Sequence, residues 1–119
     1  MADEAQSWKA QILDADDLPR EEVNEWGIKF WLRTLTGAER DKFEQRMHDM
    51  RKDDRISIIG MKAYLIILCA VDEGGENIFA PTDLNALQGK SAAVIDRLFQ
   101  IAQRMNHLLP EDVEALAGN

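Results

Sequence analysis

The chain has little cysteine and histidine. Among its 119 residues there are one cysteine and two histidines. Cys69 cannot form an internal disulfide, and because it lies inside an apolar run we expect it to behave as a small buried hydrophobe. His48 and His107 are far apart in the sequence, so no short zinc-binding motif is present. Composition therefore excludes a disulfide scaffold and predicts no metal site.

Positive charge is also scarce. The chain has 14 Lys and Arg against 22 Asp and Glu, which gives a net charge of -8 and a pI of about 4.7. A surface of this sign repels phosphate backbones and anionic lipid headgroups, so we expect no nucleic-acid and no membrane partner. The longest apolar run, residues 56–71, is interrupted by Lys62 and is shorter than the roughly 20 residues that span a membrane. With no secretory signal at the N-terminus, the expected location is the cytoplasm.

Patterns that support catalysis are missing as well. Gly74 and Gly75 lack the lysine of a phosphate-binding loop and predict a turn. The stretch DADDLPREEVNE places acidic residues at several calcium-ligand positions, but Pro19 stands where the sharp turn requires glycine. No nucleophile is paired with a base. We therefore expect no catalytic residue, no cofactor and no enzymatic activity.

The chain does contain enough apolar residues for one core. Apolar residues make up 45% of the sequence and charged residues 30%, as in ordinary globular domains. Residues 1–20 form an acidic segment that ends near Pro19, and residues 21–119 are expected to form a single helical domain. The sizeable apolar side chains of the acidic segment are Trp8, Ile12 and Leu13. This segment is either a short docking helix or frayed.

Residues 22–35 predict a small β-hairpin. In its second half Ile28, Phe30 and Leu32 alternate with Lys29, Trp31 and Arg33, which is the period of a strand. Gly27 marks the turn, and residues 22–25 form the short first strand. A two-stranded unit is marginal alone, so helices must cover it.

The rest of the chain predicts helices. Thr36 and Glu39 form a capping box at the start of one helix, whose apolar stripe comprises Phe43, Met47 and Met50. The charged run 51–55 predicts a break, although a continuous helix through residues 36–71 stays open. Residues 56–71 are apolar on almost every side, which predicts a helix surrounded by other elements.

Three further helix starts follow this segment. Pro81 begins a short helix that ends at Gly89, Ser91 caps an amphipathic helix, and Pro110 begins a last short segment. The apolar face of the amphipathic helix comprises Val94, Ile95, Leu98, Phe99, Ala102 and Met105. The predicted fold class is mainly α: a compact bundle of about four to five helices around a central apolar helix, with a small N-terminal β-hairpin.

An ordered set of short motifs runs through nearly the whole chain, roughly from Leu13 to Asn119. It comprises LP, EEV, EWG, LTGAERDKFE, LCAVDE, a GG turn with IF, KSAAVIDRLFQIAQRMNHL and EDVEAL. In this order and spacing the sequence resembles the tail assembly chaperones of long, flexible-tailed bacteriophages.

The resemblance implies a nonstructural late protein of viral tail assembly. Such a chaperone keeps the long, helical tape measure protein soluble, helps the major tail tube protein assemble around it, and is absent from the mature virion. Family members are often made in two forms, and this chain would match the short form and partner a longer frameshifted form of itself. The implied location is the host cell cytoplasm.

The sequence departs from the family pattern in two places. Asn24 precedes Glu25 where a proline is frequent, and Ile28 follows Gly27 where a second glycine is frequent, so the resemblance does not fix the geometry of the hairpin turn. Ala80 stands where a capping Ser or Asp is usual, which should weaken the following helix by about 1 kcal/mol.

The hairpin supplies the predicted partner-binding residues. They are Trp26, Phe30, Trp31 and Arg33. Aromatic and arginine side chains dominate many protein contacts, and Trp31 would lie on the face opposite the core. An equal alternative is that another helix covers Trp31. An exposed strand edge or the Met-rich stripe could also support a homo-oligomer.

Two rival functions remain in view. The first is a structural tail or connector component retained in the virion, against which the small amount of predicted strand argues. The second is a small helical transcription regulator, which the acidic charge disfavours.

Overall fold

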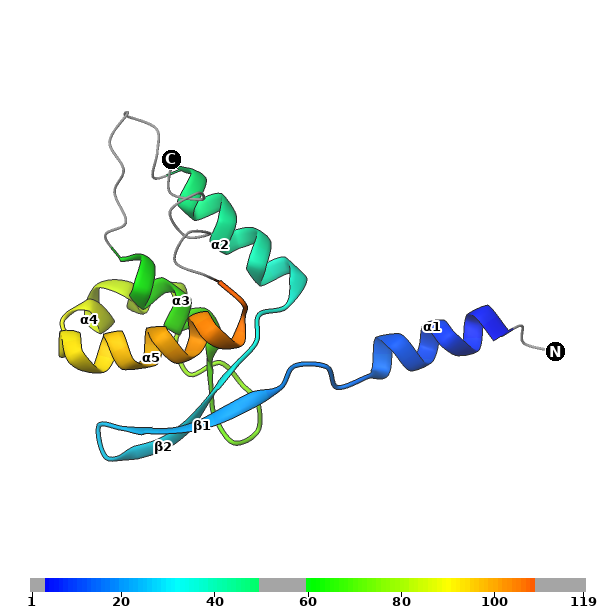
Figure 1. The fold of residues 1–119 in the computed structure, drawn as a ribbon, viewed down its shortest axis with the longest axis horizontal. Coiled ribbons are helices and arrows are strands. Elements are labelled where there is room, and N and C mark those ends of the chain that lie inside the picture. Colours follow the sequence, from blue (N-terminus) through cyan, green and yellow to red (C-terminus); the bar gives the residue numbers. More distant parts are fainter. Residues whose placement is uncertain (1–3, 50–59, 109–119) are drawn as a thin grey trace.

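The computed structural model describes residues 4–49 and 60–108, and Figure 1 shows their arrangement. The elements in chain order are α1 (Glu4–Asp14), β1 (Arg20–Glu25), β2 (Ile28–Arg33), α2 (Gly37–Asp49), α3 (Met61–Cys69), β3 (Ala70–Val71), the 3-10 helix η1 (Pro81–Asp83), α4 (Leu84–Gln88) and α5 (Ala92–Met105). Met50, the charged run 51–55 and Pro110 lie outside the described residues, so their predicted roles stay predictions.

The predicted hairpin is present, over residues 20–33 instead of 22–35. β1 and β2 pair antiparallel, with Val23 opposite Phe30. Trp26 and Gly27 form the two-residue turn, with φ of 56° and 75°. Positive φ at both central residues is the turn geometry that matches the twist of hairpin strands. Glycine adopts it freely, whereas a bulky residue such as tryptophan does so at a cost.

A third strand was not predicted. The apolar run leaves the helical conformation at Ala70, where φ is −76° and ψ is 125°. Ala70 and Val71 then pair with Leu32 and Trp31 as β3. A continuously apolar run is compatible with a buried helix or a buried strand, and this one contains both. The predicted helix 56–71 therefore ends at Cys69.

The predicted fold class, a mainly α compact bundle of helices with a two-stranded hairpin, is wrong. The described residues form five α-helices, a 3-10 helix and a three-stranded antiparallel sheet in the order β1-β2-β3. Figure 1 shows the helices α3 and α5 beside the hairpin, while α1 stands apart. The sheet is as much a part of the body as the helices.

α3 lies at the centre of the body. It contacts α2, α4, α5 and β2. Its side chains are buried on every side except at Lys62 and, partly, Tyr64. The surrounding core is completed by one face of each neighbour: Val23, Phe30, Leu32, Phe43, Met47, Leu87, Ile95, Leu98, Phe99 and Ala102. α5 thus buries the face that its periodicity predicts.

Local signals position α2 and η1. In the capping box of α2, the Glu39 amide donates to Thr36 Oγ1 at 3.1 Å, and the Thr36 amide donates to Glu39 Oε1 at 2.9 Å. Ala80 has no capping oxygen, and its own amide donates instead to Asp83 Oδ2 at 2.8 Å. Ser91 stands at the N-cap of α5 without a capping bond from its side chain.

The edge strand β1 is joined to α5 by ion pairs. Glu25 accepts two bonds from Arg97, each 2.9 Å, and Glu21 accepts bonds from Arg104 at 2.9 and 3.0 Å. The bonds from Arg97 lower the pKa of Glu25. Both glutamates share a face of β1 with buried Val23, so the two ion pairs join that face of the edge strand to α5.

Candidate functional site

The four residues predicted to bind a partner lie on both faces of the hairpin. Trp26 and Phe30 lie together, with their rings nearly parallel and their centroids 6.3 Å apart. Phe30 is only 5% exposed and belongs to the core, whereas Trp26 is 40% exposed. Trp31 and Arg33 lie on the opposite face of β2. The structure therefore does not bring the four into one surface, and their contact with a partner stays a prediction.

Trp26 contributes to an apolar groove between the hairpin turn and α4. The groove has a volume of about 310 Å³. It is lined by Trp26, Phe79, Asp83, Ala86, Leu87 and Lys90. Ile28, beside the turn, is 61% exposed. Apolar side chains at the groove and at Ile28 are therefore available to contact an apolar side chain of a partner. We call the groove itself the hairpin groove.

Trp31 is flanked by cations on the outer face of the sheet. The guanidinium carbon of Arg20 lies 4.7 Å from its ring centroid, and Lys29 Nζ lies 5.8 Å away. Arg20 is held in turn by its bond to the Glu73 carbonyl, at 2.9 Å. Trp31 is partly buried, and these two cations account for part of its cover.

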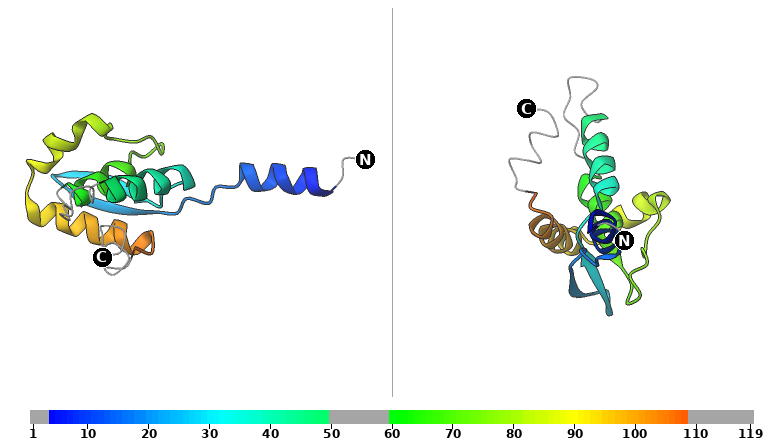
Figure 2. Two further views of the ribbon diagram at one scale, coloured as in Figure 1. Left: turned by 90° about the horizontal axis from the view of Figure 1, so that it is seen from above. Right: turned by 90° about the vertical axis from the view of Figure 1, so that its right-hand side faces the viewer.

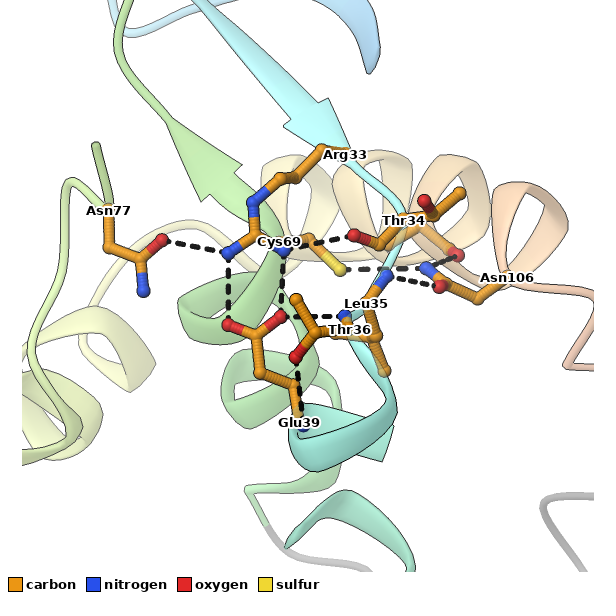
Figure 3. A network of polar contacts seen from close by, with 9 residues as sticks. Arg33, Thr34, Leu35, Thr36, Glu39, Cys69, Asn77 and Asn106 are labelled. Atoms are coloured by element: carbon orange, nitrogen blue, oxygen red, sulfur yellow. Dashed lines mark hydrogen bonds and ion pairs between the residues drawn. The ribbon is translucent and has the colours of Figure 1, made fainter. Parts of the chain in front are cut away.

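Arg33 belongs to a polar junction that Figure 3 shows. Its guanidinium donates to both carboxylate oxygens of Glu39, at 2.7 and 2.9 Å, and to Asn77 Oδ1 at 3.0 Å. The side chain is 11% exposed. The bidentate bond to Glu39 raises the pKa of Arg33. Its geometry is that of a structural link between β2, α2 and the loop after β3.

Glu39 is ionised in this junction. Burial by itself would raise its pKa, but the bonds from Arg33 and from the Thr36 amide outweigh that effect, and the pKa lies below its ordinary value. The carboxylate thus serves as the partner of Arg33 and as part of the helix cap. A charge held in this way stabilises the fold only while it remains deprotonated.

Asn106 extends the junction to α5 and α3. Its Oδ1 accepts from the Leu35 amide at 2.7 Å, and its Nδ2 donates to the Ala102 carbonyl at 2.9 Å. Nδ2 also lies 3.6 Å from the sulfur of Cys69. Burial raises the pKa of Cys69 to about 12, so the thiol stays protonated at neutral pH. This supports the expectation of an inert, buried cysteine.

A larger cleft, about 590 Å³, lies between the linker after α1 and the Gly-Gly turn. It is lined by Asp16, Leu18, Pro19, Arg20, Arg33, Val71, Glu73, Gly74 and Gly75. Its arginines are engaged in the contacts just described, and its charges are of both signs.

Within residues 4–49 and 60–108, no group of three or more acidic, His or Cys side chains is placed to hold a metal ion. No helix in these ranges is long and apolar enough to cross a membrane.

The helix α1 carries a second exposed apolar surface. Trp8 is 58% exposed, Ile12 70% and Leu13 72%. Trp8 and Ile12 are one turn apart on one face, with Leu13 beside Ile12. Figure 1 and the left view of Figure 2 show α1 standing clear of the body. We call this surface the α1 face.

Sequence reasoning identified the apolar residues of α1 but missed the hairpin groove. The groove combines the hairpin turn with Phe79 and α4, which are distant in the sequence. The sequence signal was Trp26, a tryptophan at a turn position that usually takes Asn or Gly. That signal marks Trp26 as unusual, but it does not reveal what lies opposite.

Comparison with known proteins shows a similarity in fold. No family model matches the chain, and no curated protein matches it. Among solved structures, the bacteriophage HK97 tail assembly chaperone is similar with a TM-score of 0.60. The two are 18% identical, and the match covers 84% of this chain and 97% of the HK97 chain. The resemblance predicted from the sequence motifs is therefore confirmed at the level of the fold: the chain has a tail assembly chaperone-like fold.

Proposed function

We propose that the protein is a tail assembly chaperone that binds a phage tape measure protein, keeps it soluble and helps to recruit major tail tube subunits. The observation that carries the proposal is the shared fold, which extends over most of both chains. In this role the protein acts by binding, without a catalytic residue or a cofactor.

The surface chemistry fits a client that is a long amphipathic helix. Such a helix presents apolar side chains at i, i+3 or i+4 spacing, and a groove lined by aromatic and aliphatic side chains accepts one of them. The hairpin groove has this lining, with Trp26, Phe79 and Leu87 around it. The net charge of -8 would keep the complex soluble while the client is still unassembled.

The body supplies a rigid platform for this surface. Trp26 stacks on Phe30, which is buried in the core, and this contact holds the indole in place. Preorganised aromatic side chains bind with a small loss of conformational entropy. Of the four hairpin residues predicted to bind, Trp26 is therefore the one that we place in the client contact.

The decisive experiment is co-expression with a tape measure protein from the same phage genome. We expect the soluble yield of the tape measure protein to rise, and the two proteins to copurify. Trp26→Asn should reduce both effects, because it removes the indole while suiting the turn. Ile78→Ala is the matched control, since Ile78 is 43% exposed but does not line the groove. Equal yields with and without the chaperone would refute the proposal.

The assembly context is tested separately. Mass spectrometry of purified particles should not detect this chain, since we propose a protein of the host cytoplasm that leaves before the virion matures. Its retention in particles would instead favour a structural tail or connector component. Pull-down assays with the major tail tube protein and with a longer frameshifted form of the chain test the two remaining partners.

A further inference from the structure

The hairpin groove borders a second cavity at Lys90. This cavity has a volume of about 370 Å³ and lies between the start of α3 and the start of α5, with Met61 and Ala92 in its wall. Among the described residues, Lys90 is the one that lines both this cavity and the hairpin groove. Figure 1 shows α4 and the start of α5 at the same end of the molecule as the hairpin turn. A helix seated in the hairpin groove therefore lies beside Lys90.

The backbone holds Lys90 at a fixed place relative to the groove. Its amide donates to the Leu87 carbonyl at 3.0 Å, and the Gly89 amide donates to the Ala86 carbonyl at 3.1 Å. Ala86 and Leu87 are themselves part of the groove lining. The exposed side chain of Lys90 thus begins at the rim, and its long stem places the ammonium group in solvent beside the apolar surface.

Lys90 is also the charged side chain that is left without a polar partner in this region. Asp83 accepts from the Ala80 amide at 2.8 Å. Lys62 and Asp96 form an ion pair at 2.7 Å. In the part of the chain that the structure describes, the ion pairs do not include Lys90. The charge available to an occupant is therefore positive, in a chain whose net charge is -8.

The other end of the groove accepts a large apolar side chain. Trp26, Phe79 and Leu87 line a volume of about 310 Å³. Leu87 is only 4% exposed, whereas Trp26 keeps its indole at the rim although its φ of 56° disfavours bulky residues. An apolar side chain that enters this space is removed from water without leaving a polar group unpaired.

Helix geometry connects the apolar end to Lys90. On an α-helix, side chains three or four positions apart are neighbours on one face, with roughly 5–6 Å between their Cβ atoms. An acidic side chain one turn from the inserted apolar one would therefore lie beside Lys90 at the rim. An exposed pair of this kind adds little affinity, but a basic side chain at the same place would be repelled, so the lysine discriminates by sign.

We propose that Lys90 is a specificity-determining residue of the client site. The chaperone selects segments of an amphipathic helix in which a large aliphatic or aromatic side chain has Asp or Glu one helical turn away. The apolar side chain occupies the hairpin groove against Trp26 and Leu87, and the carboxylate pairs with Lys90. This inference rests on the proposed function, since the client is the tape measure protein, and it adds the sequence pattern by which a client segment is chosen.

Overlapping synthetic peptides that cover the tape measure protein of the same phage genome test the pattern. Peptides of roughly 20 residues are long enough to form a helix, and fluorescence anisotropy measures their binding to the full chain. We expect the bound peptides to share the apolar and acidic pair. Replacing the acidic residue of a bound peptide by lysine should weaken its binding about fivefold or more. Lys90→Glu should weaken the original peptide to a similar extent and restore binding of the lysine peptide.

Lys42→Glu is the matched control for charge. Lys42 is an exposed lysine of α2 that does not line the groove, so the substitution makes the same change in net charge elsewhere. Thermal unfolding confirms that both variants are folded. Equal effects of Lys90→Glu and Lys42→Glu would overturn the proposal, as would bound peptides that carry a basic residue at the acidic place or that lack a large apolar side chain.

The co-expression experiment separates this inference from the proposed function. If the parent chain raises the soluble yield of the tape measure protein while Lys90→Glu leaves the choice of peptides unchanged, the specificity of Lys90 is refuted and the chaperone function stands. If the parent chain neither raises the yield nor binds any peptide, the proposed function fails and this inference fails with it.

Trp26→Asn provides the complementary result. It removes the apolar contact and should weaken the acidic and the lysine peptide alike, whereas Lys90→Glu should affect the two in opposite directions. Opposite effects from Trp26→Asn, or parallel effects from Lys90→Glu, would contradict the assigned division between an apolar and a charged part of the site.

Discussion

The centre of the molecule and its periphery use apolar side chains in opposite ways. In α3, Leu65, Ile66 and Ile67 are at most 1% exposed and are surrounded by other elements of the body. In α1, Ile12 and Leu13 are at least 70% exposed on a helix that stands clear of the body. The same residue types therefore stabilise the fold in one region and are available for binding in the other.

The polar residues follow the same division. Arg33, Glu39 and Asn106 are largely buried, and they join β2, α2 and α5 through bonds of 2.7 to 2.9 Å. Lys62 and Asp96, by contrast, form an ion pair at 2.7 Å in which both side chains are about half exposed. Ion pairs of similar length therefore contribute unequally to stability, because an exposed pair is only slightly more favourable than the two hydrated charges.

Leucine truncation should give the largest contrast. Leu65→Ala leaves a cavity in the core and should lower the free energy of unfolding by about 2–5 kcal/mol. Leu13→Ala, the matched change on α1, should alter it by less than about 0.5 kcal/mol. Denaturant unfolding of dilute, monomeric protein measures both. Similar losses at the two positions would mean that α1 packs against the body.

Breaking the buried ion pair should have the next largest effect. Arg33→Met leaves the Glu39 carboxylate without its main partner and should cost about 3 kcal/mol, whereas Lys62→Ala should cost less than about 1 kcal/mol. The double variant Arg33→Met/Glu39→Met should recover part of the loss, because it no longer buries an unpaired charge. A double variant no better than Arg33→Met would contradict this explanation.

The pH dependence sharpens the same comparison. The folded-state pKa of Glu39 lies below its ordinary value of 4.5, so its contribution to stability is complete above that value and is lost as the pH falls through the lowered pKa. The free energy of unfolding should therefore fall more steeply below pH 4.5 for the parent chain than for Glu39→Gln. Parallel pH profiles would show that Glu39 is not preferentially ionised in the folded state.

The smallest effect on stability is expected at the turn. Trp26→Asn loses the stacking on Phe30 but gains a residue that tolerates positive φ, so the free energy of unfolding should change by less than about 1 kcal/mol. Its effect on the soluble yield of a co-expressed tape measure protein should be much larger. Thermal unfolding of the variant and its co-expression yield separate the two effects, and a large loss of stability would make Trp26 a structural residue.

Much of the local structure was predictable because it depends on neighbouring residues. The capping box of Thr36 and Glu39, the two-residue turn at Gly27 and the buried stripe of α5 all follow from short-range patterns. The third strand did not, since nothing local distinguishes Ala70 and Val71 from the helix that precedes them. Their conformation is decided by the free edge of β2, with which they pair.

The candidate site was less predictable than the fold. Alternation along β2 correctly separates Phe30 from Trp31 and Arg33, but it cannot show that Glu39 and Asn77 engage Arg33. Likewise the turn identifies Trp26 as unusual, while its neighbours Phe79 and Leu87 come from a distant segment. Contacts between segments far apart in sequence are set by packing of the whole chain, which a periodicity does not encode.

The division between a stable centre and an exposed apolar periphery is tested most directly by amide hydrogen exchange of the dilute protein. We predict that amides of α3 and α5 exchange slowly, because their side chains are buried in the core, while those of α1 exchange fast. Protection of α1 equal to that of α3 would contradict the account.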